Sequence, residues 1–285
     1  MSTMIKIIEC PRDAMQGLPD FIPTQLKVKY LNALLKVGFD TIDFGSFVSP
    51  KAIPQMRDSA EVLSQLDLSK SSARLLAIVA NLRGATDAAK FDDIDYLGYP
   101  FSVSETFQIR NTNATIEESL QRVAQIQEIC QSHGKGLVLY LSMAFGNPFG
   151  DAWNVDIVQG WVDKLADMDI KIMALSDTVG VSTPHSISYL YSNLIPPYPD
   201  VEFGAHLHTT PDSWYPKVHA AYEHGCLRFD SAIRGYGGCP MAKHELTGNM
   251  ATEHLFEFFD GKKIPLNLSR PAFEAAQDLA KEIFP

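Results

Sequence analysis

The stretch "IKIMALSDTVGVSTPHSISYLYSNLIPPYPDVEFGAHLH", from Ile170 to His208, combines two kinds of hydrophobic pattern. "IKIMALSD" at its start and "VEFGAHLH" at its end are short apolar runs of the kind found in buried β-strands. Between them, "STPHSISYLYSNLI" spaces its apolar residues as one face of a helix does. The stretch therefore predicts a strand, a helix and a second strand.

The same alternation runs along the whole chain. Apolar strands separated by helices indicate a parallel sheet covered on both faces. About eight such units in 285 residues match the size of a TIM (β/α)₈ barrel. We therefore expect an α/β fold, a barrel with its catalytic loops at the C-terminal ends of the strands. The strand candidates are Ile5–Cys10, Thr41–Phe47, Arg74–Ala80, Asp95–Ser102, Gly136–Met143, Ile170–Asp177, Val201–His208 and Leu227–Gly235.

No linker or low-complexity tract divides the chain. We expect one barrel domain over residues 1–285, with a C-terminal helical extension. A doubly wound sheet is the alternative fold, but its G-x-G-x-x-G motif does not follow the first strand. A capping-box pattern, Thr115 to Glu118, predicts the start of a long helix that ends near Gly134.

Composition narrows the choice of partners. Lys+Arg number 24 against 34 Asp+Glu, a formal net charge of −10, so we expect no nucleic-acid partner. Neither a signal peptide nor a membrane span is expected, because long apolar runs are missing from the sequence. The four cysteines have no C-x-x-C spacing. Together these features predict a cytoplasmic protein with reduced thiols.

Polar residues follow nearly every predicted strand, at the barrel end where active sites lie. Among them we expect Ser46, Asn81, Ser142 and Asn147 to contribute to substrate binding. The full set in strand order is Arg12 and Asp13, Asp43 and Ser46, Asn81, Ser104 and Glu105, Ser142 and Asn147, Asp177 and Thr178, His206 and His208, and Cys239 with Asn249.

The sharpest motif is the His-x-His pair, His206 and His208. Residues i and i+2 of a strand point to one face, so both imidazoles are expected to project into the barrel. Two hydrogen-bonded core histidines are the alternative, but the pairing favours metal ligation. Asp13 after strand one could add a carboxylate, and Asn249 a neutral oxygen. This set suits Mg²⁺ or Mn²⁺, with Zn²⁺ as an alternative.

Three further residues have two interpretations each. Arg12 is either an ordinary ion-pairing arginine or a cation aimed at developing negative charge. Cys239, within "RGYGGCPMAKHELTGNMATE", is either a small residue tolerated in a tight loop or a reactive thiol. Asp177 either caps the following helix or supports the histidines, and the sequence does not rank the two.

Six further motifs follow the predicted strands or lie between them: "PRDAMQG", "SFVSPKAIPQM", "NATIEES", "LSDTVGVSTP", "AHLH" and "GYGGCP" followed by "GNMATE". Together these motifs resemble 3-hydroxy-3-methylglutaryl-CoA lyase, of the DRE-TIM metallolyase superfamily. The resemblance extends from about Ile5 to about Phe259, and "SFVSPK" with "PQM" and "GGCP" is specific to the lyases. It implies retro-Claisen cleavage of a 3-hydroxyacyl-CoA, most simply hydroxymethylglutaryl-CoA to acetyl-CoA and acetoacetate.

The resemblance also implies roles for individual residues. Asp13, His206, His208 and Asn249 match the ligands of a divalent metal, Mg²⁺ or Mn²⁺. Arg12 matches the catalytic arginine that stabilises the enolate oxygen. Cys239 matches the loop cysteine, a candidate acid for protonating the enolate carbon, and Asp43 matches a catalytic glutamate. An acyl-CoA substrate and a homodimer are expected from the same resemblance.

The sequence departs from the family around the substrate. Asp43 is one methylene shorter than the usual glutamate, Thr209 replaces an aspartate, and Arg234 replaces a small residue. Gly17 and Leu18 stand in place of a polar "QNE", and the loop from Cys239 to Asn249 is one residue longer. Two alternatives therefore stay open: a paralogue acting on another hydroxy acid or acyl-CoA (an aldolase or Claisen-type synthase), and a non-catalytic, metal-stabilised barrel.

Overall fold

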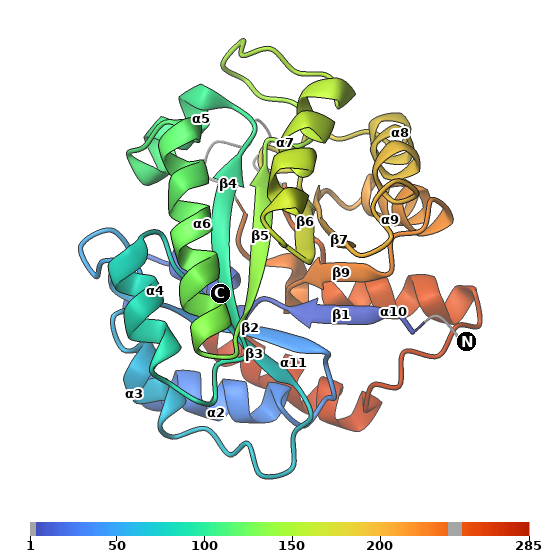
Figure 1. The fold of residues 1–285 in the computed structure, drawn as a ribbon. Helices are drawn as coiled ribbons and strands as arrows, with labels where there is room; N and C mark the ends of the chain where they lie inside the picture. The colour runs from blue at the N-terminus through green and yellow to red at the C-terminus, as the bar shows by residue number, and fades with distance from the viewer. Residues whose placement is uncertain (1–3, 239–246, 285) are drawn as a thin grey trace.

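The computed structural model describes residues 4–238 and 247–284, and within them eight parallel strands close into a barrel (Figure 1). The barrel strands are β1 (Lys6–Glu9), β2 (Thr41–Ser46), β3 (Arg74–Ile78), β4 (Tyr96–Ser102), β5 (Gly136–Ser142), β6 (Ile172–Ser176), β7 (Glu202–His206) and β9 (Arg228–Ser231). Strand β9 pairs with both β7 and β1, which closes the ring. The predicted TIM barrel is confirmed, and the doubly wound alternative is wrong because the first barrel strand pairs with the last, whereas a doubly wound sheet is open.

Helices cover the outside of the barrel (Figure 1). The longer helices are α2 (Thr24–Leu34), α4 (Leu82–Ala89), α5 (Glu105–Thr112), α6 (Ile116–Ser132), α7 (Val155–Asp167), α8 (Pro184–Leu194), α9 (Trp214–Glu223), α10 (Thr252–Gly261) and α11 (Arg270–Ile283). The shorter ones are α1 (Pro11–Gln16), α3 (Ser59–Leu63), η1 (Pro54–Met56) and η2 (Ile233–Gly235). The long helix α6 begins with the predicted capping box, in which Thr115 and Glu118 bind each other's backbone N–H groups.

Two differences from the predicted elements affect the site. Arg12 and Asp13 lie in the short helix α1, where Pro11 fits the first turn because that turn needs no N–H donor. The predicted strand Val201–His208 is interrupted after His206, and His208 belongs to β8 (His208–Thr209). Strand β8 pairs antiparallel with β10 (Gly248–Asn249), outside the barrel sheet. The two histidines therefore belong to different sheets.

Most of the apolar core lies between the strands and the helices, and a smaller cluster fills the barrel itself. The smaller cluster consists of Leu76, Ile78, Val138, Tyr140 and Ala174. Such layers of side chains make a barrel interior a packed core rather than a pore. The polar residues that follow the strands therefore lie above a packed apolar core.

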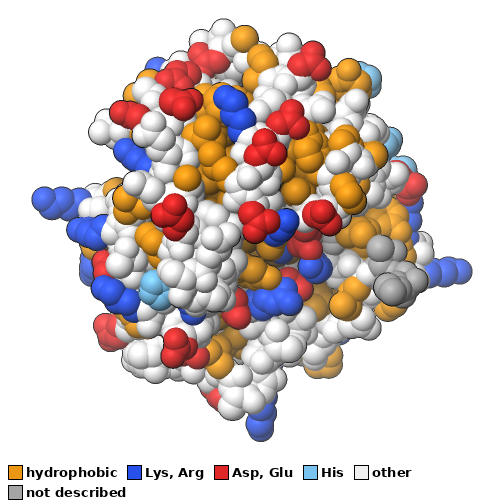
Figure 2. All heavy atoms as spheres, viewed as in Figure 1, with side chains coloured by type: hydrophobic (Ala, Val, Ile, Leu, Met, Phe, Trp, Pro, Cys, Tyr) orange, Lys and Arg blue, Asp and Glu red, His pale blue; other side chains and the backbone are white. Residues whose placement is uncertain are grey.

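Beyond the last barrel strand, α11 packs against α2 at the lower edge of the view in Figure 1. Phe284, just after α11, contacts the ring of Tyr30 from α2 edge-on and stacks on Tyr236. The face shown in Figure 2 intersperses acidic, basic and apolar side chains. None of the described helices is long and apolar enough to cross a membrane.

Candidate active site

A cavity of about 430 Å³ opens at the C-terminal ends of the barrel strands. Arg12, Asp13, Ser142, His206 and His208 line it, as predicted from their positions after the strands. Its other lining residues are Gln16, Gly17, Val48, Ile53, Ile78, Ala80, Pro100, Phe107, Asn111, Thr112, Tyr140, Ser176, Thr178, Gly237 and Gly238. The cavity therefore has a polar side, near α1 and the histidines, and the rest of its wall is largely apolar.

Arg12 is held between two carboxylates. Its Nε donates to both oxygens of Asp43, at 3.2 and 3.0 Å, and Nη2 donates to Asp43 as well. Nη1 donates to Asp13 Oδ1 at 2.9 Å. This forked pairing fixes the plane of the guanidinium, which a lysine could not reproduce. The structure therefore favours a positioned cation at the cavity wall.

Burial and pairing together set the charges of these three groups. Burial lowers the pKa of Arg12, but Asp43 and then Asp13 raise it above the usual value. Burial raises the pKa of Asp43 to about 6 in spite of the opposing charge of Arg12. Burial also raises the pKa of Asp13, but Arg12 and then His206 outweigh it and leave that pKa lowered. Asp13 is therefore ionised at neutral pH.

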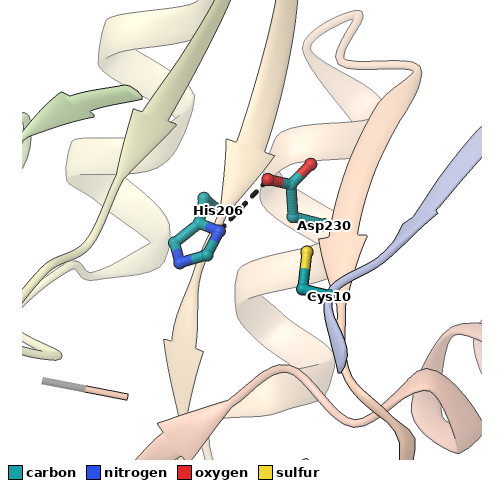
Figure 3. Close-up of side chains that lie close together, drawn as sticks. All are labelled: Cys10, His206 and Asp230. Atoms are coloured by element: carbon teal, nitrogen blue, oxygen red, sulfur yellow. Dashed lines mark hydrogen bonds and ion pairs between the residues drawn. The ribbon is translucent and has the colours of Figure 1, made fainter. Parts of the chain in front are cut away.

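His206 is oriented by a carboxylate that the sequence analysis did not single out. Its Nδ1 lies 3.1 Å from Asp230 Oδ2, and Figure 3 shows the other ring nitrogen pointing away from Asp230. Burial lowers the pKa of His206, but the hydrogen bond and charge of Asp230 raise it above the usual value. A carboxylate on one ring nitrogen is the usual support of a metal-ligating histidine. Asp230 thus leaves the second nitrogen of His206 for the cavity.

Cys10 lies beside this pair (Figure 3). Among the described residues, Cys10, His206 and Asp230 form a group of possible metal ligands, with one ligand atom from each within 4.8 Å of the others. Asp13 and the two histidines form no group as tight. Burial, followed by the charges of Asp230 and Asp43, holds the pKa of the Cys10 thiol well above its usual value. Because the thiolate is the metal-binding form, Cys10 is a poor ligand here.

His208 and Asn249 are brought together by the pairing of β8 with β10. Asn249 Nδ2 donates to Asp13 Oδ2 at 2.7 Å and to the Tyr236 carbonyl at 2.9 Å. Burial, followed by the charge of His206, lowers the pKa of His208 to about 4, so its ring is neutral at neutral pH. Neutral imidazole is the form that binds metals.

The predicted ligands have buried atoms that suit a divalent cation. His208 Nδ1 and Asn249 Oδ1 are buried without a hydrogen-bond partner among the described residues. A buried polar atom without a partner costs free energy, so both atoms are suited to an added cation. Asp13 supplies a negative charge and His206 a second imidazole. Nitrogen and oxygen donors in this mixture fit Mg²⁺, Mn²⁺ or Zn²⁺.

Asp177 does not cap α8, whose N-cap is Thr183, but it binds the loop before that helix and supports a histidine. Its Oδ1 accepts the backbone N–H of Ser182 at 2.9 Å, which holds the loop before α8. Its Oδ2 binds Lys217 Nζ at 2.7 Å, and the same ammonium donates to the His208 carbonyl at 2.8 Å. Asp177 therefore supports the backbone of His208 through Lys217.

Three of the four residues expected at the substrate have their polar groups engaged elsewhere. Ser46 donates to the Ile78 carbonyl. Asn81 caps α4 by accepting the Gly84 N–H. Asn147 accepts the N–H groups of Phe149 and Asp151 within its own loop. Bonds to backbone groups therefore occupy these three side chains, whereas Ser142 lines the cavity.

Sequence reasoning missed Asp230 and Lys217, and Cys239 lies outside the described residues. Asp230 falls inside an apolar strand, and a charge in such a strand was a usable signal. Lys217 is 4% exposed, although a lysine is almost never fully buried unless it is paired. Its position in a helix gave no sign of that burial.

Comparison with known proteins places these residues in a family context. The family model described as HMGL-like matches residues 5–279. A cytoplasmic 3-hydroxy-3-methylglutaryl-CoA lyase from Danio rerio is 32% identical over 260 residues, which cover 90% of this chain and 76% of the relative. A (R)-citramalyl-CoA lyase from Chloroflexus aurantiacus is 29% identical and covers 94% of this chain and 87% of its own.

Solved structures give the same result for the fold. An HMG-CoA lyase from Acinetobacter baumannii, in complex with coenzyme A and 3-methylmalate, superimposes with a TM-score of 0.90 at 30% identity. The superposition covers 99% of this chain and 92% of that one. The two chains therefore share the barrel along nearly their whole length.

Proposed function

The chain belongs to the HMGL-like family, and from this we propose that it is a metal-dependent lyase that cleaves a carbon–carbon bond in a 3-hydroxyacyl-CoA. Hydroxymethylglutaryl-CoA is the first candidate substrate, with acetyl-CoA and acetoacetate as products. The observation that carries the proposal is the pair of unpartnered ligand atoms on His208 and Asn249, beside an arginine with a fixed orientation.

Asp13, His206, His208 and Asn249 are the proposed metal ligands, and Mg²⁺ or Mn²⁺ is the proposed ion. When bound, such a cation lowers the pKa of a nearby hydroxyl and polarises oxygen atoms. The neutral ring of His208 and the ionised carboxylate of Asp13 are ready to bind without first losing a proton.

Arg12 is proposed to stabilise the enolate. Transfer of the C3 hydroxyl proton to a base lets the C2–C3 bond break, with its electron pair passing to C2. The step forms the ketone of one product and the thioester enolate of the other. Arg12 is 7% exposed, so little water weakens its field. Asp43 and Asp13 prevent the guanidinium from turning as negative charge develops on the enolate oxygen.

Cys239 is proposed to donate the proton that the enolate carbon needs, which yields the acetyl thioester. Asp43, in contrast, is 0% exposed and bound to Arg12, so its proposed contribution is to hold that arginine. Substituting Cys239 with Ser should leave metal binding intact and slow turnover, because a hydroxyl is a much weaker acid than a thiol. Unchanged turnover would assign the protonation to another group.

The acyl group is the finer part of the proposal. The apolar wall of the cavity, with Val48, Ile53 and Ile78, suits an alkyl substituent at C3. The similarity to the citramalyl-CoA lyase makes a different hydroxyacyl-CoA the second candidate. A cytoplasmic location and a homodimer are also part of the proposal.

The decisive experiment is a substrate panel. Protein loaded with Mn²⁺ is incubated with hydroxymethylglutaryl-CoA, citramalyl-CoA and saturated acyl-CoA controls, and products are identified by mass spectrometry. We expect acetyl-CoA from at least one hydroxyacyl-CoA, and none in an Asp13→Asn variant. Absence of cleavage throughout the panel would favour the non-catalytic barrel.

A further inference from the structure

Glu9 is a buried carboxyl at the end of β1 that does not line the cavity. It is 0% exposed. Its Oε1 accepts the backbone N–H of Ile233 at 2.8 Å, and its Oε2 is bonded to the Thr252 hydroxyl at 2.6 Å. A group buried so completely needs a structural reason, because burying a carboxyl away from water is costly.

Ile233 and Thr252 are the two flanks of one loop. Between them lie Gly237 and Gly238 of the cavity wall and the proposed ligand Asn249. Backbone bonds also join the flanks: Ala232 N–H donates to the Met250 carbonyl at 2.9 Å, and Thr252 N–H donates to the Ala232 carbonyl at 3.1 Å. Glu9 is therefore the side chain from outside the loop that binds both of its flanks.

The residue after Ile233 is held in the same way. The Arg234 N–H donates to Glu253, with distances of 3.1 and 3.0 Å to the two carboxylate oxygens. Arg234 has a φ of 63°, a left-handed conformation that is unfavourable for an arginine. Two successive N–H groups, bound by the side chains of Glu9 and Glu253, stabilise this turn at the start of the loop.

The turn is hydrogen-bonded to Asn249. The Tyr236 carbonyl accepts a hydrogen bond from Asn249 Nδ2. Gly237 has a φ of 89°, and a Cβ built on it would lie 2.7 Å from Asn249 Nδ2 and 2.8 Å from the Asp13 carbonyl oxygen. With so little space, a displacement of the flanks would move the Asn249 amide relative to Asp13.

We infer that Glu9, through its bonds to Ile233 and Thr252, is a positioning residue that fixes Asn249 in the metal site. This inference rests on the proposed function, in which Asn249 is a ligand. Groups that support a ligand from behind commonly change metal affinity by ~10–100-fold when removed. Glu9 acts at longer range than such groups, so we expect the lower end of that range.

The charge of Glu9 guides the choice of variants. Burial raises its pKa to about 8, against the lowering effect of the bonds from Thr252 and Ile233, and Glu253 raises it slightly further. A protonated Glu9 can donate to Thr252 Oγ1, which then donates to Ser231 Oγ at 3.0 Å. Glutamine is neutral and can make the same bonds, so Glu9→Gln is the conservative variant.

The test measures Mn²⁺ binding by titration calorimetry and by the EPR signal of the free ion. We expect Thr252→Val and Glu9→Leu to raise the dissociation constant about tenfold. Thr252→Ser and Glu9→Gln should stay within about twofold of the parent protein. The matched control is Ser119→Ala, which removes a buried hydroxyl bonded to Gln108 at 2.8 Å in α6, away from the loop.

Asn249→Ala separates the two levels of the inference. If it binds Mn²⁺ as the parent does, the proposed ligand set is wrong and the role of Glu9 falls with it. If Asn249→Ala binds weakly but Thr252→Val binds normally, only the positioning role is overturned. An equal loss in Ser119→Ala would also overturn it, because the effect would then reflect general destabilisation. Should Glu9→Leu fail to fold, the pair Thr252→Val and Thr252→Ser still decides.

Discussion

The two halves of the polar side of the cavity differ in how completely their buried atoms are paired. Around Arg12, each guanidinium nitrogen and each oxygen of Asp43 has a partner within the protein. Around His208 and Asn249, a ring nitrogen and an amide oxygen are buried without partners among the described residues. The Arg12 guanidinium already has its partners within the protein and could act on a substrate as it stands. Buried ligand atoms without partners instead indicate a place for an added cation. The difference supports the proposal that the charge of Arg12 acts on the substrate and that the other half holds a cation.

Breaking the unpaired half should have the largest effect. His208→Ala removes a neutral ligand and should abolish most divalent-metal binding, and turnover with it, while the fold remains. Elemental analysis after dialysis measures bound metal, and circular dichroism checks the fold. His219→Ala, on the exposed side of α9, is the matched histidine control. Full metal occupancy in His208→Ala would contradict the assignment of this half.

The paired half should respond differently. Arg12→Lys keeps the charge but loses the planar fork that meets Asp43 and the developing enolate. We expect turnover to fall by ~10²–10³, the usual loss for one preorganised donor. Metal content should stay at the level of the parent protein. Steady-state kinetics with Mn²⁺-loaded protein measures this, and a near-normal rate would reduce Arg12 to a structural ion pair.

The two halves could not be predicted equally well from the sequence. The barrel follows from alternating patterns of period 2 and 3.6, because burial imposes those periods on every strand and helix. The His-x-His motif likewise pointed to the unpaired half. The break after His206 was not predictable, because β8 depends on pairing with β10, 40 residues further along the chain.

Residues that support others were the hardest to predict. Asp230 and Glu9 are charged residues in barrel strands, and their partners, His206 and Thr252, are known only from the fold. Asn81 and Asn147 show the opposite difficulty. Their amides cap local backbone, and the same side chain would have served equally well to bind a substrate.

A substitution of Asp230 tests the unpaired half through the orientation of His206, and its expected effect on metal affinity is smaller. Asp230→Asn retains the size of the side chain but weakens the bond that orients His206. We expect metal affinity to fall by ~10–100-fold, with binding still measurable. Competition of the variant with a metal-sensitive fluorescent chelator gives the dissociation constant. An unchanged constant would show that His206 needs no carboxylate to hold its ring.

The smallest effect on activity is expected at Glu9, where the test is the pH dependence of stability. Burial raises the pKa of Glu9 in the folded protein to about 8, whereas an unfolded chain has the ordinary value of 4.5. Between these values the folded state keeps a proton that the unfolded state has lost. The contribution of Glu9 to the free energy of unfolding therefore falls as pH rises through this window, and levels off above pH 8. Glu9→Gln carries no such proton, so the stability of the parent protein relative to this variant should decline from about pH 5 to pH 8.

Urea unfolding of both metal-free proteins at several pH values measures that difference. A difference that stays constant from pH 5 to pH 8 would mean that Glu9 is ionised in the fold, and that Glu9 binds Ile233 and Thr252 as a carboxylate.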